Sequence, residues 1–287
     1  MTQARALRLL LMAVVLFGGV WPVTKDALRD ATPLWFGFSR AALAAVATAL
    51  LMAGMGRLRL PGRADRPTVL AVGTLQIGAF FALAHAALLH VPAGRTAVLA
   101  NVTIFWLVPL SVWMLGEAVS ARRWVAAAIG LAGVAVMTGP WAFDWSAPGM
   151  LSGHALLLGA SLCWSLAIVI TRLRPPQTPM IALLPTIFTV GALVQLPVAL
   201  WREPYGGLGW DAAFQAGFIG LFAAPVGTWA LIEAGRNLNA VVASLGFLLV
   251  PVVGVALATL WLGEPLGWDL LLGGALVVLS VVLAAKG

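Results

Sequence analysis

Long apolar runs, separated by short polar or Pro/Gly-rich breaks, make up almost the whole chain. A helix rises about 1.5 Å per residue, so about 20 apolar residues are needed to cross the hydrocarbon core of a bilayer. The runs lack the alternation of a half-buried strand, and backbone groups in lipid must form their hydrogen bonds internally. The pattern therefore predicts an all-α membrane protein with ten transmembrane helices, at about 7–24, 34–55, 69–90, 97–115, 124–140, 152–170, 181–201, 212–232, 239–262 and 268–285.

The composition also indicates a lipid environment. Hydrophobic residues make up 62% of the chain and charged residues 9%, whereas a soluble domain carries roughly 25% charged residues. The formal charge of +7 would suit nucleic-acid binding, but the basic residues lie in short gaps between apolar runs and not on one face of a folded module. We therefore expect a lipid bilayer and no nucleic acid as partner. The single cysteine excludes an intrachain disulfide and a multi-cysteine metal site, and we expect neither a metal nor a cofactor.

The distribution of lysine and arginine between the loops predicts the orientation. With the N-terminus inside, twelve basic residues face the cytoplasm and four face outward, while Arg40 lies within a predicted helix. The inner set is Arg5, Arg8, Arg57, Arg59, Arg63, Arg66, Arg122, Arg123, Arg172, Arg174, Arg236 and Lys286, and the outer set is Lys25, Arg29, Arg95 and Arg202. An even number of spans returns the C-terminus to the cytoplasm. We therefore predict a multi-pass protein of the bacterial cytoplasmic (inner) membrane with both termini in the cytoplasm.

The chain contains an internal repeat at one fixed offset of 147 residues. The tripeptide Leu-Gly-Glu occurs at 115–117 and again at 262–264, and the same offset relates Phe17 to Trp164. Because each half holds five predicted helices, an odd number, the second half enters the membrane from the opposite side. We therefore predict two inverted five-helix repeats that form one integrated transmembrane unit. The predicted halves are residues 1–146 and 147–287.

Several residues recur at matching places in the two halves. Each half begins with an aromatic residue that is followed eight positions later by a basic one, Phe17 with Lys25 and Trp164 with Arg172. Arg40 lies early in the second helix, and the fourth helix of each half ends in apolar-Gly-Glu. In these features nearly the whole chain resembles the EamA-type branch of the drug/metabolite transporter superfamily, and its aromatic-rich spans are similar to those of exporters of aromatic and other neutral amino acids. The resemblance implies ten helices around a central cavity and export of metabolites.

Polar and aromatic residues within the spans are the candidate substrate-binding residues. On the third predicted helix, Thr74, Phe81 and His85 fall on one face at helical spacing. The full candidate set is His85, Asn101, Trp164, Trp229, Phe81, Trp106, Thr228 and Ser165. Each of them has an alternative role, because polar side chains also join neighbouring helices and aromatic stripes also pack or face lipid. As a binding site, this mixture of aromatic and neutral polar groups predicts a cavity for zwitterions with apolar or aromatic side chains.

A second set of residues has predicted structural or gating roles. Arg40 lies six residues into its predicted helix, about 9 Å deep, where it would snorkel outward, pair within the bundle or bind a substrate carboxylate; Ile187 stands at the same position of the second half. Two carboxylates at helix ends would cap the next helix or lock the half-repeat, and three prolines within spans allow kinks at gates or in ordinary packing. These residues are Glu117, Glu264, Pro109, Pro225 and Pro251.

Other functional classes lack their sequence signatures. The chain has no HExxH or GxSxG motif of an enzyme, no P-loop of an ATP-driven pump, and no pattern that suggests a channel filter. All ten acidic residues fall in predicted loops or at helix ends, so we expect no obligatory proton coupling through a buried carboxylate. We expect a monomeric secondary transporter that exports a small-molecule substrate, neutral or aromatic amino acids, by alternating access. The alternative is a drug or other metabolite efflux carrier of the same superfamily.

Overall fold

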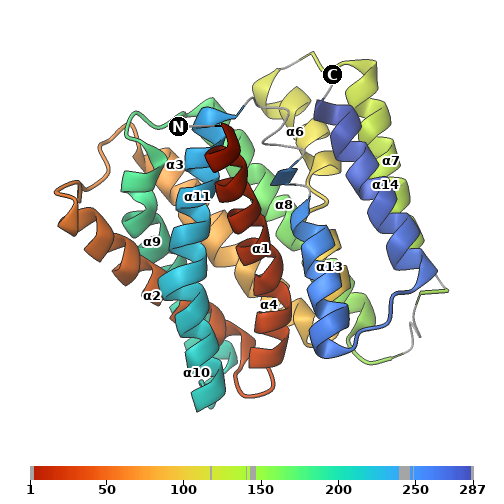
Figure 1. Cartoon of the computed structure of the whole chain (residues 1–287), viewed down its shortest axis with the longest axis horizontal. Helices are drawn as coiled ribbons and strands as arrows, with labels where there is room; N and C mark the ends of the chain where they lie inside the picture. Colours follow the sequence, from red (N-terminus) through yellow and green to blue (C-terminus); the bar gives the residue numbers. More distant parts are fainter. Residues whose placement is uncertain are drawn as a thin grey trace.

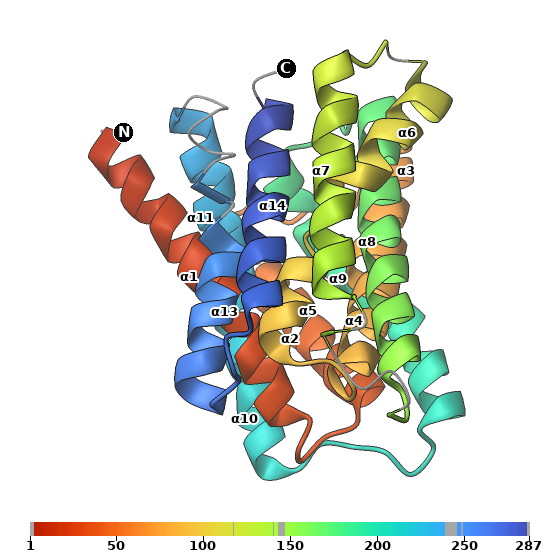
Figure 2. The ribbon, with the colours of Figure 1, turned by 90° about the vertical axis from the view of Figure 1, so that its right-hand side faces the viewer.

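The structure, a computed structural model, describes residues 3–116, 118–139, 141–142, 147–238, 246–247 and 249–285. Regular structure within these residues is helical, apart from one isolated antiparallel bridge between Ala31 and Leu208. The helices run side by side as one bundle (Figure 1), and the start of α1 and the end of α14 lie at the same end of it (Figure 2). We call this the termini end of the bundle.

Each half of the chain contributes a similar series of helices. The first half contains α1 (Gln3–Ala27), α2 (Pro33–Gly54), α3 (Arg66–Ala71), the π-helix η1 (Val72–Ala79), α4 (Phe80–Leu88), α5 (Ala93–Leu99), α6 (Ile104–Leu115) and α7 (Ala121–Met137). The second half contains α8 (Met150–Leu173), α9 (Met180–Arg202), α10 (Trp210–Gly217), the π-helix η2 (Phe218–Ala223), α11 (Ala224–Asn237), α13 (Leu249–Leu262) and α14 (Trp268–Ala285).

The lengths and apolar character of these helices agree with a multi-pass membrane protein. Six helical segments in the described part of the chain are long and apolar enough to cross a bilayer, and shorter apolar helices accompany them. The six are Gln3–Ala27, Pro33–Gly54, Arg66–Leu88, Met150–Leu173, Met180–Arg202 and Trp210–Gly235. The all-helical prediction is therefore confirmed, while the count of ten spans stays a prediction.

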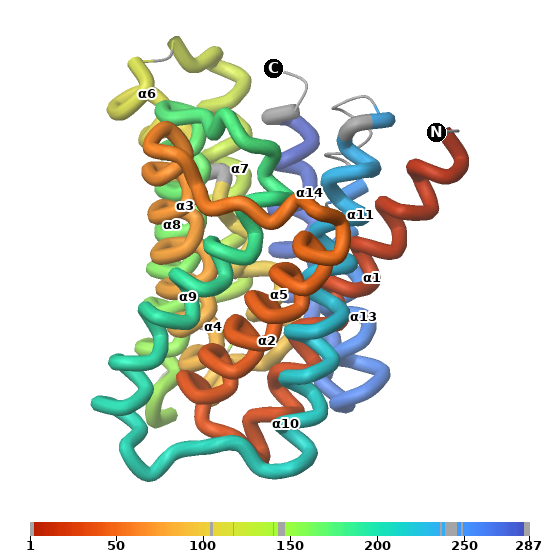
Figure 3. The backbone as a smooth tube through the Cα atoms, turned by 90° about the vertical axis from the view of Figure 1, so that its left-hand side faces the viewer, coloured from red at the N-terminus to blue at the C-terminus, as the bar shows by residue number. Residues whose placement is uncertain are grey.

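The third helical segment of each half contains a π-helical stretch, which the sequence analysis did not predict. Gly73 in η1 and Gly220 in η2 are 147 residues apart. A Cβ atom at Gly73 would lie 2.7 Å from Val190 on α9, and one at Gly220 would lie 2.6 Å from the carbonyl oxygen of Arg40 on α2. Glycine is therefore required for this close approach. The contacts are reciprocal, because the third segment of each half packs on the second helix of the other, and α2 and α9 also lie together (Figure 3).

The fourth predicted helix, 97–115, is broken in the structure. Helix α5 ends at Leu99 and α6 begins at Ile104. Asparagine and β-branched residues are weak helix formers, and Asn101, Val102 and Thr103 occupy the break. The amide of Asn101 donates a 2.7 Å hydrogen bond to the carbonyl oxygen of Ala97. A discontinuous helix of this kind exposes backbone polar groups inside a bundle, and in transporters such groups contribute to binding sites.

The loop before α3 is fixed to the loop before α9 at the termini end. The carboxylate of Asp65 accepts hydrogen bonds from the Thr178 hydroxyl at 2.7 Å and from the backbone N–H of Gln177 at 2.7 Å. Hydrogen bonding to Thr178, first from its hydroxyl and then from its N–H, lowers the pKa of Asp65 from its usual value. This contact joins the two halves of the chain outside the apolar spans.

Candidate functional site

Three of the predicted residues meet between α2 and α4. Arg40 is 6% exposed and His85 is fully buried. The Nη1 atom of Arg40 lies 3.2 Å from Nε2 of His85, and its Cζ atom lies 3.7 Å from the centroid of the Phe81 ring. Arg40 therefore points into the bundle and does not snorkel outward.

The contact between Arg40 and His85 defines the proton position on the imidazole. Arginine has only donors, so Nε2 of His85 must accept the hydrogen bond. The neutral ring then carries its proton on Nδ1, which lies 3.1 Å from the position of a Cβ atom on Gly37. Gln195 of α9 approaches the same glycine, because its Oε1 atom lies 2.1 Å from that position. Only glycine leaves room for both polar side chains next to α2.

A continuous aromatic cluster extends from this pair to α8. The Phe81 ring packs edge-on against Phe80 at 4.9 Å between centroids, and Phe80 packs against Trp164 at 4.8 Å. Trp21 of α1 lies 6.2 Å from Phe80. Phe81 and Trp164 are only partly buried, whereas Phe80 and Trp21 are buried.

Hydroxyl groups connect the aromatic cluster to the break between α5 and α6. Ser165 of α8 donates to the carbonyl oxygens of Ser161 at 2.7 Å and Thr103 at 3.3 Å. The indole N–H of Trp106 donates to the Ser161 hydroxyl oxygen at 3.0 Å. The structure thus brings Trp106, Trp164 and Ser165 together at the broken helix, where aromatic faces and neutral polar groups meet.

The remaining predicted binding residues lie elsewhere. The side-chain amide of Asn101 donates to the backbone carbonyl oxygen of Ala97, one turn earlier in the chain. Thr228 and Trp229 lie on α11, where Trp229 is 39% exposed and lines a cavity of about 610 Å³ between α2, α9 and α11 at the termini end. The walls of this cavity are mainly apolar, and the loop residues Arg57 and Arg59 also line it.

The predicted structural residues occupy distinct positions. The carboxylate of Glu264 accepts hydrogen bonds from the N–H groups of Ala93 at 2.6 Å and Gly94 at 2.8 Å, so it caps α5, a helix of the other half. Glu117 lies outside the described residues. Pro109 is within α6, Pro225 directly follows η2 at the start of α11, and Pro251 is in the first turn of α13.

Sequence reasoning missed several residues that build the site. Phe80 and Trp21 join the aromatic cluster, and buried Gln195 lies next to Gly37, as His85 does. The glutamine carried a usable signal, since any polar side chain within an apolar run is a candidate for a specific contact. The two aromatic residues carried none, because aromatic residues are common throughout these spans.

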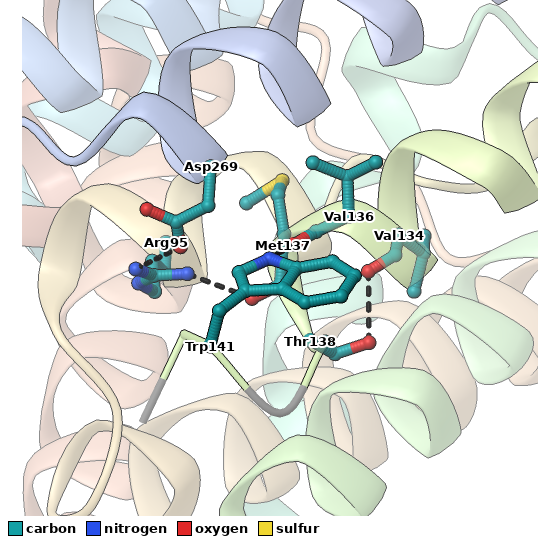
Figure 4. A network of polar contacts seen from close by, with 7 residues as sticks. All are labelled: Arg95, Val134, Val136, Met137, Thr138, Trp141 and Asp269. Atoms are coloured by element: carbon teal, nitrogen blue, oxygen red, sulfur yellow. Dashed lines mark hydrogen bonds and ion pairs between the residues drawn. The ribbon is translucent and has the colours of Figure 1, made fainter. Parts of the chain in front are cut away.

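A second buried arginine lies away from this cluster. Arg95 of α5 forms an ion pair with Asp269 of α14 and donates a 2.7 Å hydrogen bond to the carbonyl oxygen of Met137 (Figure 4). Next to it, the indole N–H of Trp141 donates to the carbonyl oxygen of Val136 at 2.9 Å. This network joins α5, α7 and α14 and contains no residue of the predicted binding set. No three His, Cys, Asp or Glu side chains among the described residues gather as a metal site.

Comparisons with known proteins agree with this arrangement. The sequence pattern of the EamA-like transporter family matches residues 4–139 and again 151–286, so the two matches are displaced by 147 residues at both ends. The chain is 28% identical over 290 residues to an uncharacterized transporter, YvbV, of Bacillus subtilis (strain 168), with 98% of this chain and 92% of the relative covered.

A second relative is named as an amino-acid exporter. The chain is 25% identical over 298 residues to a probable terminal-alkyne amino-acid exporter of Streptantibioticus cattleyicolor, with 99% of this chain and 94% of the relative covered. One solved crystal structure shares 16% sequence identity and superposes with a TM-score of 0.66 over 97% of this chain and 96% of that chain. This likeness shows a common fold.

Proposed function

This chain belongs to the EamA-like transporter family, and from that membership we propose that it exports neutral or aromatic amino acids from the bacterial cytoplasm by alternating access. The observation that carries the proposal is the cluster at the broken helix, where the partly buried rings of Phe81 and Trp164 pack on buried Phe80 beside neutral hydroxyl groups. Such a site buries an apolar body and orients it with few polar contacts. A relative that is a probable terminal-alkyne amino-acid exporter supports an amino acid as the substrate class.

The proposed architecture is ten transmembrane helices in two inverted halves, residues 1–146 and 147–287. Two observations support it. The reciprocal packing of Gly73 on α9 and Gly220 on α2 is the arrangement that a two-fold axis in the membrane plane produces. The start of α1 and the end of α14 share one end of the bundle, as an even number of spans requires. Alternating access then moves the halves around a site between them, in a monomer.

We propose that transport runs down the substrate gradient without obligatory proton coupling. In the described part of the chain the acidic residue nearest to mid-span is Glu233, four residues before the end of α11. His85 accepts a hydrogen bond from Arg40 at Nε2, and a second proton on the ring would remove that contact. A facilitator that rocks around a central site needs neither group to titrate.

Efflux of drugs or other metabolites is the second candidate function. Its support is the cavity of about 610 Å³ at the termini end, whose mainly apolar walls include Trp229 and Pro225. A cavity of this size suits an amphiphilic molecule larger than an amino acid.

Efflux from proteoliposomes tests the proposed substrate class. Labelled phenylalanine, tryptophan and a terminal-alkyne amino acid should leave the vesicles down their gradients with no pH difference. Trp106 and Trp113 lie on the same helix, but Trp106 contacts Ser161 while Trp113 is 80% exposed. Trp106→Ala should therefore slow efflux, and the matched control Trp113→Ala should not. Transport of cationic drugs with no amino-acid efflux would favour the second candidate.

Reporter fusions test the proposed orientation. A reporter at Gly287 and one in the 144–147 loop should report the cytoplasm and the outer side, respectively. Cysteine substitutions at Trp164 and Trp229, in a Cys163→Ala background, then show which positions a substrate protects from a polar thiol reagent. The same side for both reporters would contradict the ten-span arrangement.

A further inference from the structure

Arg40 is a buried guanidinium that has no carboxylate partner in the part of the chain that the structure describes. It is 6% exposed, and its contacts in the described part of the chain are Nε2 of His85 at 3.2 Å and the ring of Phe81 at 3.7 Å. The ion pairs among the described residues are Arg29 with Asp26 and Arg95 with Asp269. Among the described residues, no anion therefore contacts the guanidinium of Arg40 inside the bundle.

Such a charge is costly unless something compensates it. Removing a guanidinium from water is unfavourable, and an ionised side chain within a span is normally paired. A neutral imidazole and an aromatic face offset only part of this cost, because neither carries a negative charge. A residue that is retained at such a position without a structural partner is a candidate for binding an anion that is absent from the protein itself.

The guanidinium also has unused hydrogen-bonding capacity. Arginine has five N–H donors, and one nitrogen of Arg40 contacts His85 while the ring of Phe81 covers one face of the group. The other nitrogens have no hydrogen-bond partner among the described residues. Two parallel N–H groups at the edge of a guanidinium match the two oxygens of a carboxylate.

The aromatic cluster begins at the same place. Phe81 contacts Arg40 on one side and Phe80 on the other, and Phe80 contacts Trp164. We propose that Arg40 binds the carboxylate of the transported molecule while its apolar part lies on this aromatic surface, so that the substrates are monocarboxylates. His85 acts as a positioning residue, because it holds the guanidinium at Nη1. The inference rests on the proposed function for the position of the site.

The chemistry of the ligand provides the test. Phenylalanine is compared with phenylalaninamide and phenethylamine, which keep the ring and the amine and lack the carboxylate. Uptake and binding are measured in proteoliposomes for the wild type, Arg40→Met, Arg40→Lys and the control Arg29→Met, whose side chain is 74% exposed at the end of α1. The wild type and Arg29→Met should prefer phenylalanine by about 10- to 100-fold, the range for hydrogen bonds to a charged group.

Arg40→Met should lose this preference and remain folded, with a raised KM for phenylalanine. Arg40→Lys should keep part of the preference, because the positive charge remains while the two parallel N–H donors of the guanidinium are lost. A preference that survives in both variants, with unchanged KM, would overturn the inference and leave amino-acid export intact. If the wild type transports phenylacetate but no amino acid, and Arg40→Met does not, the carboxylate site stands and the proposed function fails. If Arg40→Met does not fold, the preference of Arg40→Lys for phenylalanine over the two compounds that lack the carboxylate decides between these outcomes alone.

Discussion

The two buried arginines in the described part of the chain have opposite surroundings. Arg95 is 9% exposed and contacts a carboxylate, Asp269, and a backbone carbonyl oxygen. Arg40 is 6% exposed and contacts a neutral imidazole and an aromatic ring. The two side chains are therefore buried to nearly the same extent. An ion pair compensates the charge of Arg95, whereas the neutral contacts of Arg40 compensate its charge only in part.

This difference separates a structural role from a functional one. An ion pair whose two members come from α5 and α14 fixes those helices, and neither member can be lost alone without leaving an unpaired charge. A guanidinium that has only neutral partners fixes little and remains able to attract an anion. The proposal that Arg40 serves binding therefore rests on the missing counter-ion and not on burial, which the two arginines share.

The largest expected effect on the free energy of unfolding follows from removing one member of the Arg95–Asp269 ion pair. Arg95→Met leaves the carboxylate of Asp269 buried without its cation, which should lower the free energy of unfolding by about 3–5 kcal/mol. Thermal unfolding in detergent measures the loss. The double variant Arg95→Met/Asp269→Leu should recover most of it, because no charge then remains. A double variant as unstable as the single one would break the comparison.

The same substitution at the other arginine should behave differently. Arg40→Met removes a charge that has no counter-ion, so we expect the free energy of unfolding to stay equal or to rise by about 1 kcal/mol. The unfolding assay is the one used for Arg95→Met, which serves as the matched control. A loss as large as that of Arg95→Met would mean that Arg40 stabilises the fold and that the two sites do not differ.

Substitution of the carboxylates that cap helices should change the free energy of unfolding by less. Glu264→Gln keeps an acceptor but removes the charge opposite the N–H groups of Ala93 and Gly94, and should cost about 1 kcal/mol. Glu203 contacts the N–H groups of Leu34 and Trp35 at longer distances, 3.2 and 3.3 Å, so Glu203→Gln should cost less. Thermal unfolding ranks the two, and the reverse order would contradict the distance argument.

The smallest effect is expected at Asp65 and depends on pH. The pKa of this carboxylate is lowered in the folded state, chiefly by the hydroxyl of Thr178. Its stabilising contribution is therefore present above the unfolded pKa of about 4 and is lost as the pH falls through the folded pKa. Asp65→Asn should lower Tm at pH 7 and make its decline on acidification shallower, with Thr178→Val intermediate. Identical pH profiles for wild type and Asp65→Asn would exclude this role.

Helix faces were predictable only where the helix stayed regular. Phe81 and His85, four residues apart within α4, share a face as the sequence predicts. Thr74 does not join them, because it lies within η1, and the π-helical turn between it and Phe81 adds a residue that rotates the face by about 100°. Its hydroxyl instead donates to the carbonyl oxygen of Leu70 within the same helix.

The residues of the candidate site were predictable only in part. The sequence identifies polar and aromatic residues within apolar spans as candidates, and the structure places two of them, Trp106 and Ser165, in hydrogen bonds to Ser161; their role in binding stays a prediction. The sequence does not show that Trp229 lines the cavity at the termini end or that the Asn101 side chain bonds to Ala97 one turn earlier. Those outcomes depend on how each helix is rotated about its axis by its neighbours.

The sequence by itself determined what is local or periodic in this protein. Apolar runs define helices because backbone groups in lipid must bond within a segment, and the offset of 147 residues appears in both the residue pairs and the two family matches. Only the tertiary structure decided the partner of each buried charge. Arg40 meets His85 45 residues away and Arg95 meets Asp269 174 residues away, and which of them gains a carboxylate depends on packing between helices that spacing along the chain does not encode.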